Sequence, residues 1–266
     1  MPSVIAFEPR RFESAASYYV EGRPRYSDLL IRRVAQFLRF DGTQKLLDLG
    51  TGPGLLAVAF APFAGEVTAI DPEPEMLRIA AAQATAAGVH LTLLEGSSYT
   101  LSQHLGPFDL VTIGRAFHWM DRQATLETLD KLIRPGGAIA LCATRQPHVP
   151  ENQWTKDYDA LRETHAEPNS PRKTIRGPDW LSHEAILLNS PFAALERISV
   201  IERRTTPLEQ FVTRALSLSS SSPGRMGTNV DDFAQAIRDA LSKSAVDGLI
   251  QEVVESEALL AFRSPP

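Results

Sequence analysis

Cysteine is nearly absent from this sequence. Cys142 is the one cysteine in 266 residues, so no disulfide can form within the chain, and a reducing compartment is expected. It lies in the apolar stretch 138–142, where a small core residue is a commoner finding than a nucleophile. No run approaches the ~18 apolar residues needed to span a membrane, and residues 1–10 lack the apolar segment of a signal peptide. We therefore expect a cytoplasmic protein with no membrane partner.

An excess of basic residues is also missing. The formal net charge is -5 at pH 7, and no stretch concentrates lysine or arginine. A nucleic-acid partner usually requires a basic surface, so none is expected. The histidines show no paired spacing of the kind that binds a metal ion, so no metal site is expected either. Apolar residues make up 43% of the chain, which is ample for one large α/β domain or two small ones.

Short apolar runs alternate with amphipathic stretches over the first half of the chain. This alternation predicts an α/β fold with a doubly wound, mostly parallel sheet and helices on both faces. Strands are expected at 45–49, 67–71, 89–94, 109–113, 138–143, 195–204 and 252–262. Helices are expected at 27–39, 54–64, 74–87, 122–133 and 230–243, and another is expected to open at a capping box formed by Thr206 and Glu209. Residues 144–190 have no clean period and predict loops and short helices.

The stretch 45–56 combines the end of a buried strand, a glycine turn and the start of a helix. Gly50, Gly52 and Gly54 lie in the turn, and an acid precedes them at position 48. Such a turn brings backbone N–H groups close to a small ligand. Asp71 follows 19 residues after Gly52, at the end of the next apolar run, where a carboxylate can accept from both hydroxyls of a ribose. Together these features predict a nucleoside-binding site.

Two classes of cofactor are bound by this arrangement. A dinucleotide fingerprint needs a third glycine where this chain has Leu55, and Asp48 would repel a pyrophosphate but attract the ammonium group of an amino acid. An NAD-dependent oxidoreductase is therefore disfavoured. The motif 48–54 resembles the first motif of the class I S-adenosylmethionine-dependent methyltransferases. Residues 106–113 resemble the fourth-strand motif of that family, and residues 132–137 resemble the turn before its fifth strand.

Two further segments resemble the "type 11" subgroup of this family, which includes relatives of trans-aconitate methyltransferase. They are Ala-Phe-His-Trp at 116–119 and the spaced pattern of aromatic, alanine and Arg-Pro residues over 12–26. The resemblance implies a single domain over 1–266 with a Rossmann-like methyltransferase fold of seven strands, the last one antiparallel beside the fifth. It assigns 10–143 to the cofactor-binding core. The helical insertions 144–190 and 205–250 are expected to wall an acceptor pocket.

The resemblance implies S-adenosylmethionine as the cofactor and S-adenosylhomocysteine as the product. Asp48 is then expected to face the amino group of the cofactor, Asp71 its ribose hydroxyls and Arg23 its carboxylate. Other readings remain open at this point. Asp48 and Asp71 could be a helix cap or turn acids, and Arg23 could belong to an ordinary turn.

Other residues are expected to border the adenine. Pro72 and Met76 would lie against it, and Ser97 occupies a position where many relatives carry an acid that accepts from the adenine amino group. A hydroxyl can accept the same bond more weakly. The full set of expected cofactor-binding residues is Tyr19, Arg23, Asp48, Gly50, Thr51, Gly52, Asp71, Pro72, Met76, Gly96, Ser97, Ser98, Arg115 and Ala116.

His118 is the one histidine that the resemblance places over the cofactor. Methyl transfer is an in-line displacement at a sulfonium carbon, and a histidine of near-neutral pKa could remove a proton from the acceptor. His118 could instead shape the pocket through ring contacts, with Trp119 as packing. A carboxylate acceptor would need no base, because it is already ionised at pH 7.

The absence of two motifs narrows the acceptor. Residues 114–117 do not form the Asn- or Asp-Pro-Pro-aromatic tetrad that accompanies methylation of base nitrogens, and no double-glutamate loop of a protein arginine methyltransferase is present. We therefore expect a small organic acceptor with an oxygen, nitrogen or carbon nucleophile, a carboxylate among the candidates. The alternative is a protein that binds S-adenosylmethionine without methyl transfer, as a sensor or as a scaffold for another reaction. The sequence leaves the oligomeric state open.

Overall fold

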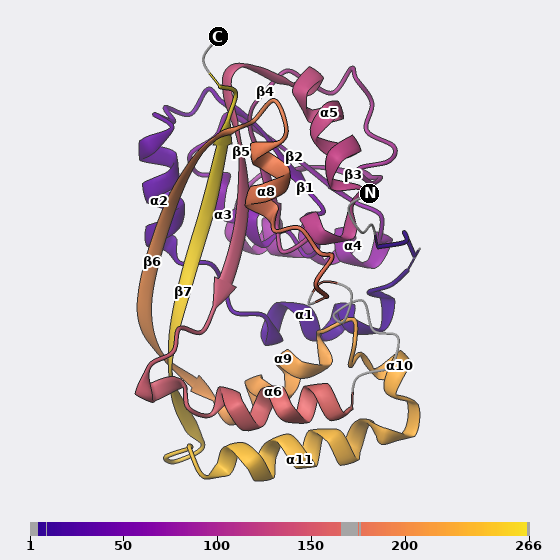
Figure 1. Cartoon of the computed structure of the whole chain (residues 1–266), viewed down its shortest axis with the longest axis vertical. Coiled ribbons are helices and arrows are strands. Elements are labelled where there is room, and N and C mark those ends of the chain that lie inside the picture. Colours follow the sequence, from indigo (N-terminus) through magenta and orange to yellow (C-terminus); the bar gives the residue numbers. More distant parts are fainter. Residues whose placement is uncertain (1–4, 9, 166–174, 176, 265–266) are drawn as a thin grey trace.

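A computed structural model describes residues 5–8, 10–165, 175 and 177–264. Seven strands form one sheet in the order β3-β2-β1-β4-β5-β7-β6 (Figure 1). Their bounds are β1 Lys45–Leu49, β2 Glu66–Asp71, β3 Thr92–Glu95, β4 Phe108–Gly114, β5 Ile133–Arg145, β6 Ala194–Pro207 and β7 Leu249–Phe262. The first five strands pair in parallel, whereas β7 runs antiparallel to both β5 and β6. The expected doubly wound α/β fold of seven strands is therefore confirmed.

Helices cover both faces of the sheet, so that each face has its own core. The helices of the first part of the chain are α1 Ala16–Gly22, α2 Asp28–Phe37, α3 Leu55–Phe60, α4 Pro74–Ala87 and α5 Arg122–Leu132, with the short 3-10 turns η1 Glu13–Ala15 and η2 Phe117–Trp119. On one face α2 and α3 bury Leu30 and Phe60, and Cys142 lies in this core. On the other face α5 and α8 (His183–Leu188) bury Leu126 and Leu187. Alternation along each strand supplies both cores, because successive side chains point to opposite faces.

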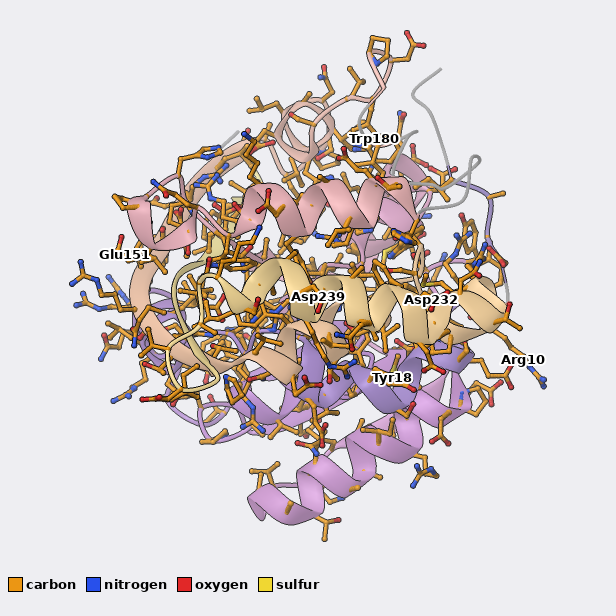
Figure 2. The ribbon with its side chains drawn as sticks, turned by 90° about the horizontal axis from the view of Figure 1, so that it is seen from below. Arg10, Tyr18, Glu151, Trp180, Asp232 and Asp239 are labelled. Atoms are coloured by element: carbon orange, nitrogen blue, oxygen red, sulfur yellow. The ribbon has the colours of Figure 1, made fainter. Side chains whose placement is uncertain are left out.

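A third core joins helices of the C-terminal half below the sheet in Figure 1. Its elements are η3 Pro150–Asn152, α6 Thr155–Thr164, α9 Leu208–Leu216, α10 Pro223–Met226, η4 Gly227–Asn229 and α11 Val230–Ser242. Phe211 and Phe233 are fully buried in it, while Asp232 and Asp239 lie on the outer side of α11 (Figure 2). Between this layer and the sheet lies α1, which packs against α9. Within the described part of the chain, no helix is long and apolar enough to cross a bilayer.

The predicted capping box at Thr206 is wrong. Thr206 belongs to β6, and its hydroxyl donates to Glu252 Oε1 at 2.7 Å instead of capping a helix. The helix α9 begins only at Leu208, with Pro207 as an N-cap that provides no side-chain bond, and Glu209 pairs with Arg238. The Thr206 hydroxyl therefore bonds to the buried Glu252 carboxylate on the neighbouring strand and not to the backbone of the helix that follows. The strands β6 and β7 also run further than predicted at this end, because they pair along their whole length.

Candidate functional site

The turn between β1 and α3 is built from residues in left-handed backbone conformations. φ is 70° at Gly50, 54° at Gly52 and 81° at Gly54, a region that residues with a Cβ rarely adopt. The amides of Gly50 and Thr51 donate to the Ile70 carbonyl at 2.8 and 3.0 Å, which ties the turn to the end of β2. A Cβ placed on Gly52 would meet no atom within 4 Å. The turn therefore leaves room for a ligand directly against its backbone.

Asp71 ends β2 and faces this turn. Its Oδ2 accepts from the Gly52 amide at 2.7 Å, and its Oδ1 accepts from the Glu73 amide at 3.0 Å. Burial raises the pKa of the Asp71 carboxyl to about 6, although both amide bonds oppose the shift. Each carboxylate oxygen retains a lone pair beyond its amide bond. Asp71 can therefore accept further hydrogen bonds from hydroxyls of a ligand.

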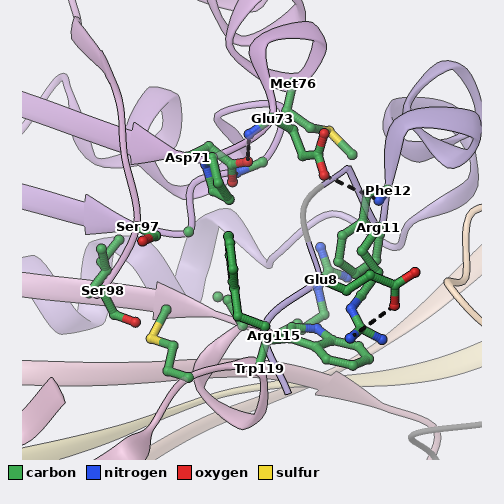
Figure 3. A pocket seen from close by; sticks show the side chains of 18 of the residues that line it. Glu8, Arg11, Phe12, Asp71, Glu73, Met76, Ser97, Ser98, Arg115 and Trp119 are labelled. Atoms are coloured by element: carbon green, nitrogen blue, oxygen red, sulfur yellow. Dashed lines mark hydrogen bonds and ion pairs between the residues drawn. The ribbon is translucent and has the colours of Figure 1, made fainter. Parts of the chain in front are cut away.

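A cavity opens in front of the glycine turn and Asp71 (Figure 3). About 810 Å³ of space there, the opening to solvent included, is not filled by atoms of the chain. Ten of the expected cofactor-binding residues line it: Tyr19, Gly50, Gly52, Asp71, Pro72, Met76, Ser97, Ser98, Arg115 and Ala116. Residues from α1 and from the loops after β1, β2, β3 and β4 thus meet around one space.

An N-terminal wall, formed by residues 6–8 together with Arg11 and Phe12, closes one side of the cavity (Figure 3). The Phe7 ring lies 5.6 Å from the Tyr99 ring, and the Phe12 ring lies 5.7 Å from the Trp119 ring. The Phe12 amide also donates to the Glu73 carboxylate at 3.5 Å. Sequence reasoning missed this wall as part of the site. The signal that could have found it is Phe7, a second aromatic residue shortly before Phe12, with which the N-terminal pattern over 12–26 begins.

Asp48 lies beneath the turn and not in this cavity. Its Oδ1 accepts from the Thr112 hydroxyl at 2.7 Å, and its Oδ2 accepts from the Thr51 hydroxyl at 2.6 Å and from a backbone amide of α3 at 3.2 Å. Burial raises the pKa of this carboxyl, and the three hydrogen bonds oppose the rise. Asp48 and Thr51 line a smaller pocket that shares Tyr19 and Arg115 with the larger cavity. Asp48 thus braces the turn, and its contact with a cofactor amino group stays a prediction.

Two guanidinium groups lie against the Tyr19 ring; Arg115 lines both pockets, whereas Arg23 lines neither of them. Arg23 lies 4.8 Å from the centre of the Tyr19 ring, and Arg115 lies 6.0 Å from it. Arg23 Nη2 donates to the Ser217 carbonyl at 3.1 Å, and Arg115 Nη1 donates to the Pro24 carbonyl at 3.2 Å. The Nε atom of each is buried without a hydrogen-bond partner, and neither side chain has a carboxylate partner within the described ranges. Two such cations with spare donors form a site suited to a carboxylate of a ligand.

Arg115 also has a strained backbone. Its φ is 56°, in the left-handed region, and its amide donates to the Cys142 carbonyl at 3.0 Å. A residue with a Cβ adopts this conformation at a cost of about 1–2 kcal/mol. Such strain is found most often at functional sites. At the carboxyl end of β4, it directs the guanidinium back over the rings of Tyr19 and Tyr26.

His118 lies in η2 directly after β4, as expected. Its neighbours Ala116 and Trp119 line the cavity, but His118 itself does not. Its ring lies 4.5 Å from the Trp119 ring and, nearly parallel, 6.5 Å from the His183 ring. Burial, helped by the cations nearby, lowers the pKa of His118 to about 3, so that the ring is neutral at pH 7. The structure thus places His118 one layer behind the cavity wall.

The guanidiniums of Arg23, Arg122 and Arg11 all lower the pKa of His118, and the His183 ring acts in the same direction. Arg122 Nη1 donates to the Leu181 carbonyl at 2.7 Å, while its Nη2 is buried with no hydrogen-bond partner. Burial and Arg122 likewise lower the pKa of His183 to about 4. The cations around His118 thus lie behind the cavity wall, except Arg11, which lines the cavity and is paired with Glu8 at 3.1 Å.

The loop after β3 carries three of the expected residues, Gly96, Ser97 and Ser98. The Gly96 amide donates to the Asp71 carbonyl at 3.1 Å, so Gly96 holds this loop beside Asp71 without lining the cavity. The Ser97 hydroxyl accepts from the Tyr99 amide at 3.3 Å. Segments 144–190 and 205–250 supply none of the described lining residues, so their role at an acceptor pocket stays a prediction. The described residues also contain no group of three His, Cys, Asp or Glu side chains placed to hold a metal ion.

Comparisons with known proteins show that the chain is similar to methyltransferases in part of its sequence and in its fold. Residues 46–137 match a family model described as a methyltransferase domain. An uncharacterized methyltransferase of Mycobacterium tuberculosis is 29% identical over 168 residues, which are 63% of this chain and 65% of that protein. The match thus spans less than two thirds of the length of this relative.

Two solved structures share the fold over nearly their whole length. A S-adenosylmethionine-dependent methyltransferase from Geobacter sulfurreducens, in complex with S-adenosylhomocysteine, gives a TM-score of 0.56 at 17% identity, over 98% of this chain and 100% of that one. One from Thiobacillus denitrificans, in complex with the same molecule, gives 0.55 at 15% identity, over 97% and 100%. At such identities the likeness establishes the fold alone.

Proposed function

We propose that this chain is a S-adenosylmethionine-dependent methyltransferase that acts on a small organic acceptor. The observation that carries the proposal is the placement of the open backbone at Gly52 and the Asp71 carboxylate across one cavity. The methyltransferase-domain match over residues 46–137 supports it, and so does the bound S-adenosylhomocysteine in structures of the same fold. The type 11 subgroup remains part of the proposal.

The residues around the cavity fit the parts of this cofactor. Asp71 accepts from the ribose hydroxyls, and the apolar surfaces of Pro72 and Met76 border the adenine. Arg23 and Arg115 hold the carboxylate of the amino-acid part with their unpartnered donors. The bound cofactor supplies an electrophilic methyl group on a positively charged sulfur. The chain contributes binding, orientation of the acceptor and exclusion of water by the N-terminal wall.

A carboxylate is the acceptor group that suits the site best. Arg122, with its buried unpartnered Nη2, lies behind the cavity wall near His118 and His183 and has no carboxylate partner among the described residues. A buried cation without a counter-charge is costly, and an anionic acceptor would lower that cost. A carboxylate is also nucleophilic without losing a proton, which agrees with a neutral and weakly basic His118. His118, one layer behind the cavity wall, then holds the Trp119 ring beside the acceptor instead of deprotonating the acceptor.

Calorimetric titration with S-adenosylhomocysteine tests the cofactor, with NAD as the control. We expect S-adenosylhomocysteine to bind and NAD not to bind. A dissociation constant for S-adenosylhomocysteine weaker than about 1 mM, roughly -4 kcal/mol, would reject the proposal.

The acceptor is tested by transfer of a labelled methyl group to a panel of small carboxylic acids and to their amides. A carboxylate acceptor gives a methyl ester, which mild base hydrolyses to labelled methanol, and the amides stay unlabelled. Label in the amides to the same extent would reject the carboxylate. Tight binding of S-adenosylhomocysteine with no transfer to either panel would favour the alternative, a binding protein without methyl transfer.

A further inference from the structure

An ion pair buried among the C-terminal elements joins α9 to β7. Arg214 Nη1 and Nη2 lie 2.9 and 2.8 Å from the two carboxylate oxygens of Glu252, and Thr206 donates a third bond to the same carboxylate. The two paired side chains are 9% and 1% exposed. Burial would raise the pKa of Glu252, but the bonds from Arg214 and Thr206 hold it below its usual value. The pair therefore stays charged and fixes the position of α9 on the sheet.

The same guanidinium reaches the end of α1. Arg214 Nε donates to the Gly22 carbonyl at 3.3 Å. A Cβ placed on Gly22 would lie 2.6 Å from the Thr213 carbonyl oxygen, so α1 touches the backbone of α9 at this point. The next residue is Arg23, and its Nη2 donates to the carbonyl of Ser217, the C-cap of α9. The Ser217 hydroxyl in turn donates to the Arg214 carbonyl at 2.7 Å.

A continuous set of contacts thus leads from β7 to the site: Glu252, Arg214, the last turn of α9, and Arg23. None of these residues lines the cavity; Arg23 reaches it through the ring of Tyr19, which lines the cavity and lies 4.8 Å from the guanidinium. A hydrophobic pair of similar size is often as stabilising as a buried ion pair, so stability alone does not account for two charges here. The charged pair also fixes orientation, because the planar guanidinium of Arg214 holds two groups at once, the Glu252 carboxylate and the Gly22 carbonyl.

We propose that Arg214, fixed by Glu252, is a positioning residue that sets Arg23 toward the carboxylate of the bound cofactor. This inference rests on the proposed function, since it concerns the same cofactor. The loss of Arg214 should therefore weaken the binding of ligands that carry the amino-acid carboxylate and leave the binding of ligands that lack it unchanged.

The test compares two ligands in calorimetry: S-adenosylhomocysteine and 5′-methylthioadenosine, which keeps the adenosine part but lacks the amino acid. Single removal of Arg214 would leave Glu252 buried and unpaired, so the variant is the double change Arg214→Met/Glu252→Met. We expect it to bind S-adenosylhomocysteine about tenfold more weakly, the partial loss of one charge-assisted bond, and 5′-methylthioadenosine as the unchanged protein does. Equal weakening of both ligands, or of neither, would overturn the inference.

A second comparison, made in the Arg23→Met variant, tests whether the Arg214–Glu252 pair acts through Arg23. In Arg23→Met, the double change at Arg214 and Glu252 should weaken S-adenosylhomocysteine no further, because coupled residues are not additive. A further tenfold loss would show that the pair acts by another path. Arg263→Met, which removes the ion pair with Asp130 at the opposite end of β7, is the control and should leave both affinities unchanged. If the unchanged protein binds neither ligand, the proposed function fails, which is a different result from a failure of this inference.

Discussion

The Asp71 carboxylate accepts a hydrogen bond from the Gly52 amide at 2.7 Å, across the ends of two neighbouring strands. One carboxylate therefore both shapes the glycine turn and faces the cavity. Its ionisation matters twice, because a protonated oxygen is a poorer acceptor for the amide and for a ribose hydroxyl.

The first prediction concerns the pH dependence of cofactor binding. The pKa of Asp71 is raised to about 6 in the free protein, and hydroxyl donors of a ligand favour the ionised form. The affinity for S-adenosylhomocysteine should therefore rise as pH increases from about 5 to about 7 and stay level above. Titration calorimetry over this range measures it, and Asp71→Asn should remove most of the slope. A slope that is the same in the variant would mean that another group is responsible.

The raised pKa of Asp71 also makes the free energy of unfolding of the ligand-free protein depend on pH. An unfolded aspartate has a pKa near ~3.9. Between about pH 4 and 6 the folded state thus binds more protons at Asp71 than the unfolded state does, so its contribution to the free energy of unfolding falls as pH rises. The difference in unfolding free energy between the unchanged protein and Asp71→Asn, followed in denaturant from pH 4 to 7, should change in this direction. A difference that does not vary with pH would contradict the raised pKa.

A second prediction separates backbone strain from ligand space at Gly52. Gly52 has φ 54° and Gly88, the C-cap of α4, has φ 66°, and a Cβ would meet no atom within 4 Å at either. Alanine should therefore cost each site a similar strain of about 1–2 kcal/mol in unfolding free energy. Only Gly52→Ala should also weaken S-adenosylhomocysteine, by about tenfold or more, because only Gly52 lines the cavity. Equal affinities of the two variants would place the ligand elsewhere.

The central strands and their turn could be predicted from the sequence because their causes are local. An apolar run that ends in closely spaced glycines specifies a strand, a left-handed turn and a helix over 45–60. The place of Asp71 beside the glycine turn could be predicted because the carboxyl ends of neighbouring parallel strands meet at one edge of a sheet.

The parts that were missed depend on contacts between segments distant in sequence. The hydroxyl of Thr206 was expected to cap a helix but bonds to Glu252 on another strand. The bonds by which Asp48 braces the glycine turn were not predicted, because one of the partners, Thr112, lies 64 residues further along the chain. The N-terminal wall was missed for the same reason, because Phe7 and Phe12 are held at the cavity by contacts with the rings of Tyr99 and Trp119 on distant loops.

A third prediction concerns this wall. Phe12→Ala removes the ring contacts with Tyr19 and Trp119, whose centroids lie 6.5 and 5.7 Å away. S-adenosylhomocysteine should then dissociate faster and bind about tenfold more weakly, because the cavity is less well closed to water. Stopped-flow displacement measures the rate. Phe37→Ala is the control: Phe37 also contacts one ring, Phe262, but lies far from the cavity lining, and its loss should leave the rate unchanged. A Phe12→Ala protein that releases the ligand at the original rate would mean that the wall does not retain it.

The last prediction concerns His118. A ring with a pKa of about 3 is a poor base at neutral pH, and His118 lies behind the cavity wall, so we expect it to act on the acceptor by holding the Trp119 ring in place. His118→Ala should then raise the KM of the acceptor and lower kcat by less than about tenfold, with the affinity for S-adenosylhomocysteine unchanged. The rate of the unchanged protein on a carboxylate should be nearly flat from about pH 6 to 9. Steady-state kinetics measure all three, with the exposed His104→Ala as the control. A loss of roughly 10²–10⁴ in kcat alone would restore the role of general base, and unchanged kinetics would place His118 outside the active site.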